Sequence, residues 1–180
     1  MGGSCLLMSQ TSLRSGFILD ADVLIDYCNS DIGILGLVSE HLGRIYVPTP
    51  TLAEVRQITP ARCRELGLTL FEPEVDDLLR AAGRYGPLSF QDHLCLILAK
   101  KHKWICVTNE KLLHRRCEEA GIPVLRGLRL MVSLVEKDVL LAREALAVAE
   151  QIRESNPRFI TSEIVERFKE EIGLPLREPD

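Results

Sequence analysis

The chain has 180 residues, of which 46% are hydrophobic and 27% charged, enough apolar material for one sizeable core and too little for two full domains. Its formal net charge of −4 excludes a protein that holds nucleic acid through a broad basic field, because such binding needs clustered Lys and Arg. Any contact with nucleic acid must therefore be local or metal-assisted.

Cysteine usage and the lack of long apolar runs indicate the cellular compartment. The six cysteines include no CxxC pair, and several stand within apolar runs, which predicts buried free thiols in a reducing cytoplasm. No apolar run approaches the roughly 20 residues that a membrane span needs, so we expect no membrane contact. Residues 1–15 have no cationic start followed by a long apolar stretch, which favours a disordered leader over a signal peptide.

Strands and helices alternate along the first two thirds of the sequence. Short apolar runs predict strands at residues 17–19, 45–47, 68–71, 104–107 and 123–125. Helical patterns stand at residues 23–27, 34–42, 52–55, 74–82, 90–101 and 110–120. We expect Thr49 or Thr51 to cap the short third helix. This alternation predicts a three-layer α/β fold, in which helices cover both faces of a five-stranded parallel sheet.

The pattern becomes entirely helical after Gly127. Helices predicted at residues 130–135, 142–153 and 162–172 are expected to pack beside the sheet. We therefore divide the chain into a leader (1–15), an α/β domain (16–130) and a C-terminal helical extension (131–180).

The extension is rich in apolar residues. One helical stripe in it consists of Ile164, Val165, Phe168 and Ile172. Since the preceding helices are also apolar, a five-stranded sheet is not expected to cover all of them. We therefore predict that part of the extension forms a homodimer seam or a groove for a partner helix.

Four acidic residues are predicted to lie at one edge of the sheet. In a parallel sheet, strands end and the following helices begin at the same edge. Asp20 directly follows the first strand, and Glu54 stands in the first helical turn after the second strand. Asp92 stands in the first turn of the helix that leads to the fourth strand, and Glu110 opens the helix after that strand. Connectivity therefore places all four acids where α/β proteins bind ligands.

Each acid also has a purely structural explanation, because first helical turns favour Asp and Glu. Ser89-Phe90-Gln91-Asp92 has the spacing of a capping box, and Glu54 and Glu110 taken singly fit surface acids. Asp20 is harder to explain in this way, since an acid that closes a buried strand costs desolvation unless it is paired. Four acids with no Arg or Lys predicted at the same turns repel one another, which favours a shared cation.

The predicted cation is Mg²⁺ or Mn²⁺. The candidate ligands are hard oxygens, and no His or Cys of these motifs is placed to favour zinc. Two such ions about 4 Å apart can activate a water molecule and stabilise the leaving oxygen of a phosphodiester. The acids therefore predict hydrolysis without a covalent intermediate.

Four segments of the sequence resemble the PIN-domain ribonucleases, a family that includes the VapC-type toxins of toxin–antitoxin pairs and solitary PIN proteins. The segments are residues 17–26 (FILDADVLID), 51–55 (TLAEV), 88–93 (LSFQDH) and 107–112 (VTNEKL). The resemblance spans residues 16–127 and implies a PIN-like nuclease domain whose substrate is RNA. For a toxin, it also implies an antitoxin protein as partner.

By this resemblance, the catalytic acids are Asp20, Glu54, Asp92 and Glu110. Asp20, Asp92 and Glu110 would bind the metal ion, and Asp22 and Thr108 would support the site. The sequence departs from the family in two places. Asp22 stands where Asn, Ser or Thr is usual, and this extra acid is expected to raise the pKa of a neighbouring acid when metal is absent. Glu110 stands where Asp is usual, and its longer side chain is expected to move one metal ligand outward.

Two other readings use some of the same residues. Asp20-Ala21-Asp22-Val23 copies the nucleophile and acid pair of haloacid-dehalogenase-like phosphatases, with Thr108 and Lys111 as later motifs. That reading leaves Glu54 and Asp92 without a role, and no acid follows the fifth predicted strand, where those enzymes need one. A non-catalytic PIN-like module that uses the acids to bind a partner is the alternative from a different functional class.

Overall fold

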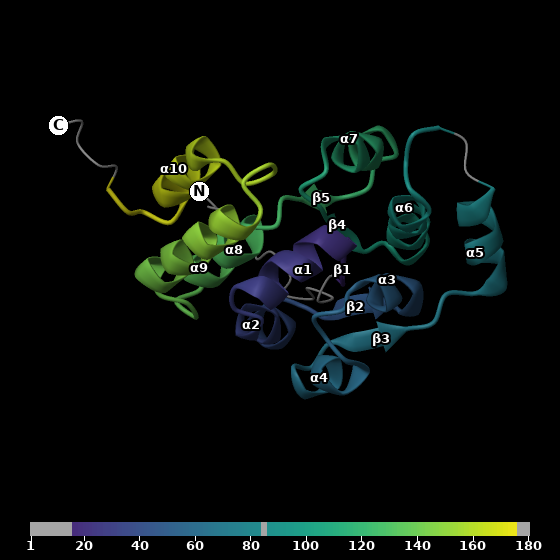
Figure 1. The fold of residues 1–180 in the computed structure, drawn as a ribbon, viewed down its shortest axis with the longest axis horizontal. Helices are drawn as coiled ribbons and strands as arrows, with labels where there is room; N and C mark the ends of the chain where they lie inside the picture. Colours follow the sequence, from purple (N-terminus) through teal and green to yellow (C-terminus); the bar gives the residue numbers. More distant parts are fainter. Residues whose placement is uncertain (1–15, 84–85, 176–180) are drawn as a thin grey trace, which may run out of the picture.

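The computed structural model describes residues 16–83 and 86–175. Its five parallel strands form one sheet in the order β3-β2-β1-β4-β5 (Figure 1). The strands are β1 (Phe17–Leu19), β2 (Ile45–Pro48), β3 (Thr69–Phe71), β4 (Ile105–Val107) and β5 (Val124–Leu125). The predicted α/β fold with a five-stranded parallel sheet between helices is confirmed. The predicted leader, residues 1–15, lies outside the described residues.

Helices cover both faces of the sheet and continue beyond it. They are α1 (Ala21–Asn29), α2 (Gly33–His41), α3 (Thr49–Glu54), α4 (Pro60–Glu65), α5 (Val75–Ala82), α6 (Phe90–His102), α7 (Lys111–Glu119), α8 (Arg129–Glu136), α9 (Ala142–Ser155) and α10 (Ser162–Glu171). In the part of the chain that the structure describes, no helix is long and apolar enough to cross a membrane.

Two local expectations differ from the structure. The sequence did not predict α4, and neither threonine caps α3. Thr49 begins α3 and its hydroxyl donates to Glu72 Oε2 at 2.8 Å, while Thr51 is buried within the helix. Pro48 instead takes the N-cap position, without a side-chain hydrogen bond.

Alternate residues of the strands face opposite layers. Ile18 of β1 packs with α5, α6 and α7, whereas Phe17 and Leu19 pack with α1, α2 and the helices of the extension. On the α6 side, Trp104 is buried and stacks on Tyr46 at 4.0 Å between ring centroids and on His102 at 4.4 Å. Trp104 is therefore a core residue. Among the described cysteines all are free and four are buried, namely Cys63, Cys95, Cys106 and Cys117.

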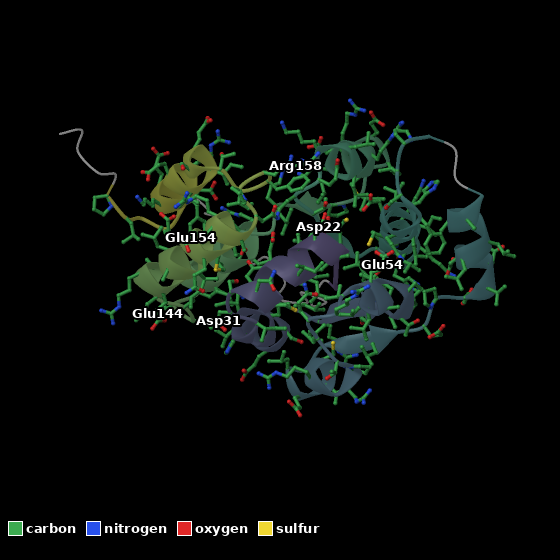
Figure 2. The ribbon with its side chains drawn as sticks, viewed as in Figure 1. Asp22, Asp31, Glu54, Glu144, Glu154 and Arg158 are labelled. Carbon is green, nitrogen blue, oxygen red and sulfur yellow. The ribbon has the colours of Figure 1, made fainter. Side chains whose placement is uncertain are left out.

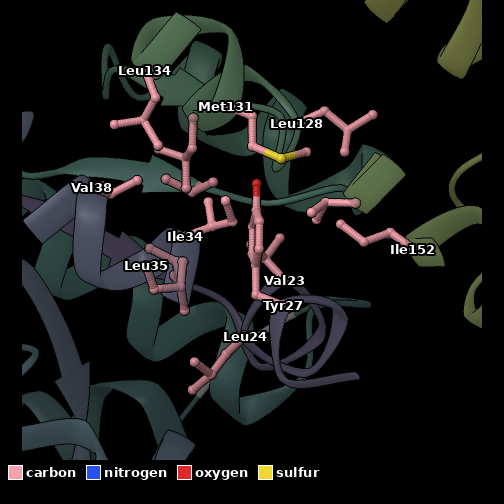
Figure 3. Close-up of a cluster of buried hydrophobic side chains, with 14 of the residues drawn as sticks. Val23, Leu24, Tyr27, Ile34, Leu35, Val38, Leu128, Met131, Leu134 and Ile152 are labelled. Atoms are coloured by element: carbon pink, nitrogen blue, oxygen red, sulfur yellow. The ribbon is translucent and has the colours of Figure 1, made fainter. Parts of the chain in front are cut away.

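The extension packs on α1 and α2 and shares one core with the sheet. Around Tyr27, side chains from α1, α2, α8 and α9 converge (Figure 3). Val165, Phe168 and Ile172 of the predicted stripe are also buried in this core, and Ile164 packs against it. Most of the apolar side chains that motivated the homodimer seam are thus buried within the chain itself, whereas Leu141 is 54% exposed. A homodimer stays a prediction.

Candidate active site

The candidate site lies where the order of the strands reverses. In the sheet, β1 stands between β2 and β4. From the end of β1 the chain continues to β2 in one direction along the sheet, and from the end of β4 it continues to β5 in the opposite direction. Asp20 follows β1 and its backbone N–H donates to Val107 O at 3.1 Å, so the two strand ends stay paired up to the acid. Open α/β sheets bind ligands at such a reversal.

Asp20 is buried, with 4% of its surface exposed, and it is the N-cap of α1. Its Oδ1 accepts a hydrogen bond from Val23 N at 2.8 Å, and its Oδ2 accepts one from the Thr108 hydroxyl. Burial is the main cause that raises the pKa of Asp20 to about 7, against the lowering effect of these two bonds. The negative charges of Asp22 and Asp92 raise it further.

Thr108 joins Asp20 to the turn that carries Glu110. Besides donating to Asp20, its oxygen accepts a hydrogen bond from Glu110 N at 3.0 Å. Glu110 is the N-cap of α7, and its Oε2 accepts from the amides of Leu112 and Leu113. Thr108 therefore links two of the predicted acids, and its role in supporting a metal site stays a prediction.

Asp92 takes part in the capping of α6, and its role as a metal ligand stays a prediction. Ser89 Oγ accepts from Asp92 N at 3.1 Å, so Ser89 caps α6. Burial raises the pKa of Asp92, hydrogen bonds with Ser89 lower it, and the charges of Glu110 and Asp22 raise it. Four acids at one sheet edge are therefore close enough for the charge of one to raise the pKa of another: Asp20, Asp22, Asp92 and Glu110.

Glu54 differs from its expected position. It is exposed and is the last residue of α3, not part of the first turn. The helix itself lies beside the start of α6, since Gln91 Nε2 donates to Pro50 O at 3.4 Å. Figure 2 shows Glu54 on α3 and Asp22 at the start of α1. A catalytic role for Glu54 stays a prediction.

The structure also buries the carboxylate of Asp26, a neighbour of Asp22 that was not predicted as a site residue. Its Oδ1 accepts from Asn156 Nδ2 at 2.9 Å and its Oδ2 accepts from Asn109 Nδ2 at 3.3 Å. Burial is the main cause that raises the pKa of Asp26 to about 6; the two amide bonds lower it and the charge of Asp22 raises it. One signal was present, because Asp26 follows Val23 by three residues and so falls on the apolar face of its helix.

A cation also stands near this edge, outside the turns that carry the four acids. Arg126, which follows β5, donates from Nη1 to Asn109 O at 2.7 Å. Its charge, after burial, helps to lower the pKa of His114. The edge thus carries acids together with Arg126, which is hydrogen-bonded to the backbone carbonyl of the residue before Glu110.

The donor set suits Mg²⁺ or Mn²⁺, because it consists of carboxylate oxygens that repel one another. Within residues 16–83 and 86–175, no three His, Cys, Asp or Glu side chains are arranged to hold one ion. Glu110 is bound to the amides of α7, and both oxygens of Asp20 accept hydrogen bonds. The acids therefore suit such an ion by charge and chemistry, although their side chains are not gathered around one ion in the described residues.

Comparison with known proteins agrees with this geometry at the level of the fold. No family model matches the chain, and no curated protein matches its sequence. Its structure is similar to that of a PilT N-terminus domain protein, SSO1118, from the hyperthermophilic archaeon Sulfolobus solfataricus P2. The TM-score is 0.50 and the identity 12%, and the match covers 66% of this chain and 92% of that one. The fold is PIN-like.

PIN is short for PilT N-terminus, so the similar structure has the fold that the sequence resemblance implies. At 12% identity the similarity shows the PIN-like fold alone.

Proposed function

We propose that this protein is a metal-dependent endoribonuclease that hydrolyses RNA phosphodiester bonds with Mg²⁺ or Mn²⁺. The observation that carries the proposal is the set of acids at the strand reversal of a PIN-like fold. The charges of Asp22 and Asp92 raise the pKa of Asp20, and those of Asp22 and Glu110 raise the pKa of Asp92. Carboxylates that repel one another in a partly buried site favour a cation.

In this proposal Asp20, Asp92 and Glu110 hold the ion, and Glu54 completes the acidic set. A bound ion would supply positive charge that polarises the phosphodiester and favours the ionised acids. Thr108 fixes one oxygen of Asp20, which keeps that carboxylate in one orientation. Arg126, exposed at the same edge, offers a positive charge to the phosphate backbone.

The first prediction concerns the metal. The purified full chain is expected to cleave labelled single-stranded RNA when Mg²⁺ or Mn²⁺ is present and to stop when a chelator is added. Gel electrophoresis of the products measures this cleavage. Glu144→Gln, which changes an exposed acid on α9, serves as the matched control and should cleave like the wild type (Figure 2). Undiminished cleavage by the chelated protein would remove the mechanism.

The same preparations separate the two rival functions. A phosphatase would release phosphate from small phosphate esters, and a binding module would bind Mn²⁺ or RNA without cleaving it. Calorimetric titration with Mn²⁺ together with both activity assays distinguishes these outcomes.

An antitoxin partner is a finer proposal, which rests on the sequence resemblance. A toxin would arrest growth when expressed alone, and a protein encoded beside it would restore growth on co-expression.

A further inference from the structure

We infer that Asn156, in the C-terminal extension, is a positioning residue of the proposed active site. Through Asp26 and Asn109 it holds the turn that carries Glu110. The catalytic meaning of this inference rests on the proposed function, whereas its structural part rests on contacts alone. Asn156 lies outside residues 16–127, which carry the resemblance to PIN-domain nucleases.

The backbone of Asn156 is fixed on both sides. It is the C-cap of α9, and its N–H donates to Ile152 O at 2.8 Å. Its carbonyl accepts from Phe159 N at 3.2 Å and from Ile160 N at 3.0 Å. Because Ile152 and Ile160 are buried in the core, the side-chain amide of Asn156 projects from a rigid turn.

This amide donates to Asp26 on α1. Asp26 is buried, and each of its carboxylate oxygens accepts from an asparagine: Oδ1 from Asn156 at 2.9 Å and Oδ2 from Asn109 at 3.3 Å. Burying a carboxylate is costly unless its oxygens are bonded, so the two amides and Asp26 fix one another. A polar link of this kind has directional preferences that apolar packing between α1 and α9 lacks.

Asn109 carries the link to the proposed catalytic turn. It stands between Thr108 and Glu110, its Oδ1 accepts from Gly127 N at 2.9 Å, and its carbonyl accepts from Arg126. A Cβ atom at Gly127 would lie 3.2 Å from Asn109 Nδ2, so the loops after β4 and β5 are in close contact here. A shift of the Asn109 side chain is therefore expected to disturb this turn.

The test compares variants that break and restore the link. Asn156→Asp replaces the donating amide by a second carboxylate facing Asp26, and Asn156→Ala removes the donor without adding charge. In the double variant Asp26→Asn with Asn156→Asp, the amide at position 26 donates to the carboxylate at position 156 and still accepts from Asn109. Such a cycle isolates the coupling between the two positions. Thr161→Ala, which removes the N-cap of α10 in the same loop, controls for general destabilisation.

Two readouts are measured on full-length, metal-free and metal-loaded protein, below the melting temperature of every variant. Backbone hydrogen exchange over residues 108–113 should be faster in Asn156→Asp and Asn156→Ala, near wild type in the double variant, and unchanged in Thr161→Ala. The kcat for RNA cleavage should fall about tenfold or more in Asn156→Asp, with little change in KM, and recover in the double variant.

The two proposals fail in different ways. Wild-type exchange at residues 108–113 in both Asn156 variants, or a double variant no better than Asn156→Asp, would overturn the positioning role. An equal fall of kcat in Thr161→Ala would also overturn it. Faster exchange in a protein whose wild type cleaves no RNA would support the link and refute the proposed function.

Discussion

Asp20 is the acid whose ionisation depends most on its surroundings. Burial raises its pKa from 3.8 to about 7, so the folded protein binds this proton more tightly than the unfolded chain does. Its contribution to stability is therefore fully present below about pH 4 and is lost as the pH rises toward 7. A bound cation would offset this loss by favouring the ionised form.

Asp20→Asn tests this linkage together with the proposed role of Asp20. In metal-free buffer the variant is expected to melt several degrees above the wild type at about pH 8, with the difference shrinking toward pH 4. Circular dichroism melts at a series of pH values measure it. The variant should also cleave no RNA, and a wild-type cleavage rate would show that Asp20 is not catalytic.

The two roles of Asp92 can be separated by changing its partner. Ser89→Ala removes the cap of α6 and should cost about 0.5–2 kcal/mol of stability while RNA cleavage continues. Asp92→Asn should abolish cleavage while the fold is kept. If Asp92→Asn cleaves normally and only lowers the melting temperature, capping is the role of Asp92.

The positions of Asp20, Asp92 and Glu110 could be predicted from the sequence, because connectivity alone fixes the edge on which strand and helix ends lie. Their catalytic roles stay predictions. Asp26 and Asn156 could not be paired from sequence, since 130 residues separate them and their contact depends on how the extension packs on α1.

At the scale of elements, the strands and most helices were predicted because short apolar runs alternate with helical patterns. The helix α4 was missed since only Cys63 among its six residues is buried, which leaves almost no apolar periodicity. The start of α3 was also misplaced. The helix begins directly after Pro48, so Glu54 falls at its last position and not in its first turn.

This difference makes Glu54→Gln an informative variant. Glu54 is exposed, so the change should alter stability by no more than about 0.5 kcal/mol. If Glu54 belongs to the catalytic set, RNA cleavage and the affinity for Mn²⁺ in calorimetry should both fall. Unchanged cleavage would leave Asp20, Asp22, Asp92 and Glu110 as the acids of the site.

For the whole molecule, one core joins the extension to the side of the sheet that carries α1 and α2. The helix that Asp20 caps is thus covered by α9 on its outer side, and Tyr27 of the same helix donates to Gly127 O at 2.8 Å. The sequence predicted three helices beside the sheet but not this shared core, because apolar stripes do not reveal which surfaces they cover.

Deleting residues 156–180 tests what the end of the extension does. The deletion removes Ile160, Val165, Phe168 and Ile172, which are buried, and each such side chain contributes about 1.5–3 kcal/mol. That sum is comparable with the roughly 5–15 kcal/mol that stabilises a typical domain. The truncated chain should therefore lose cooperative unfolding and aggregate, as measured by thermal melts and light scattering. A mass near twice the 20.2 kDa of the intact chain, falling on truncation to a monomer with the wild-type melting temperature, would instead indicate a homodimer seam.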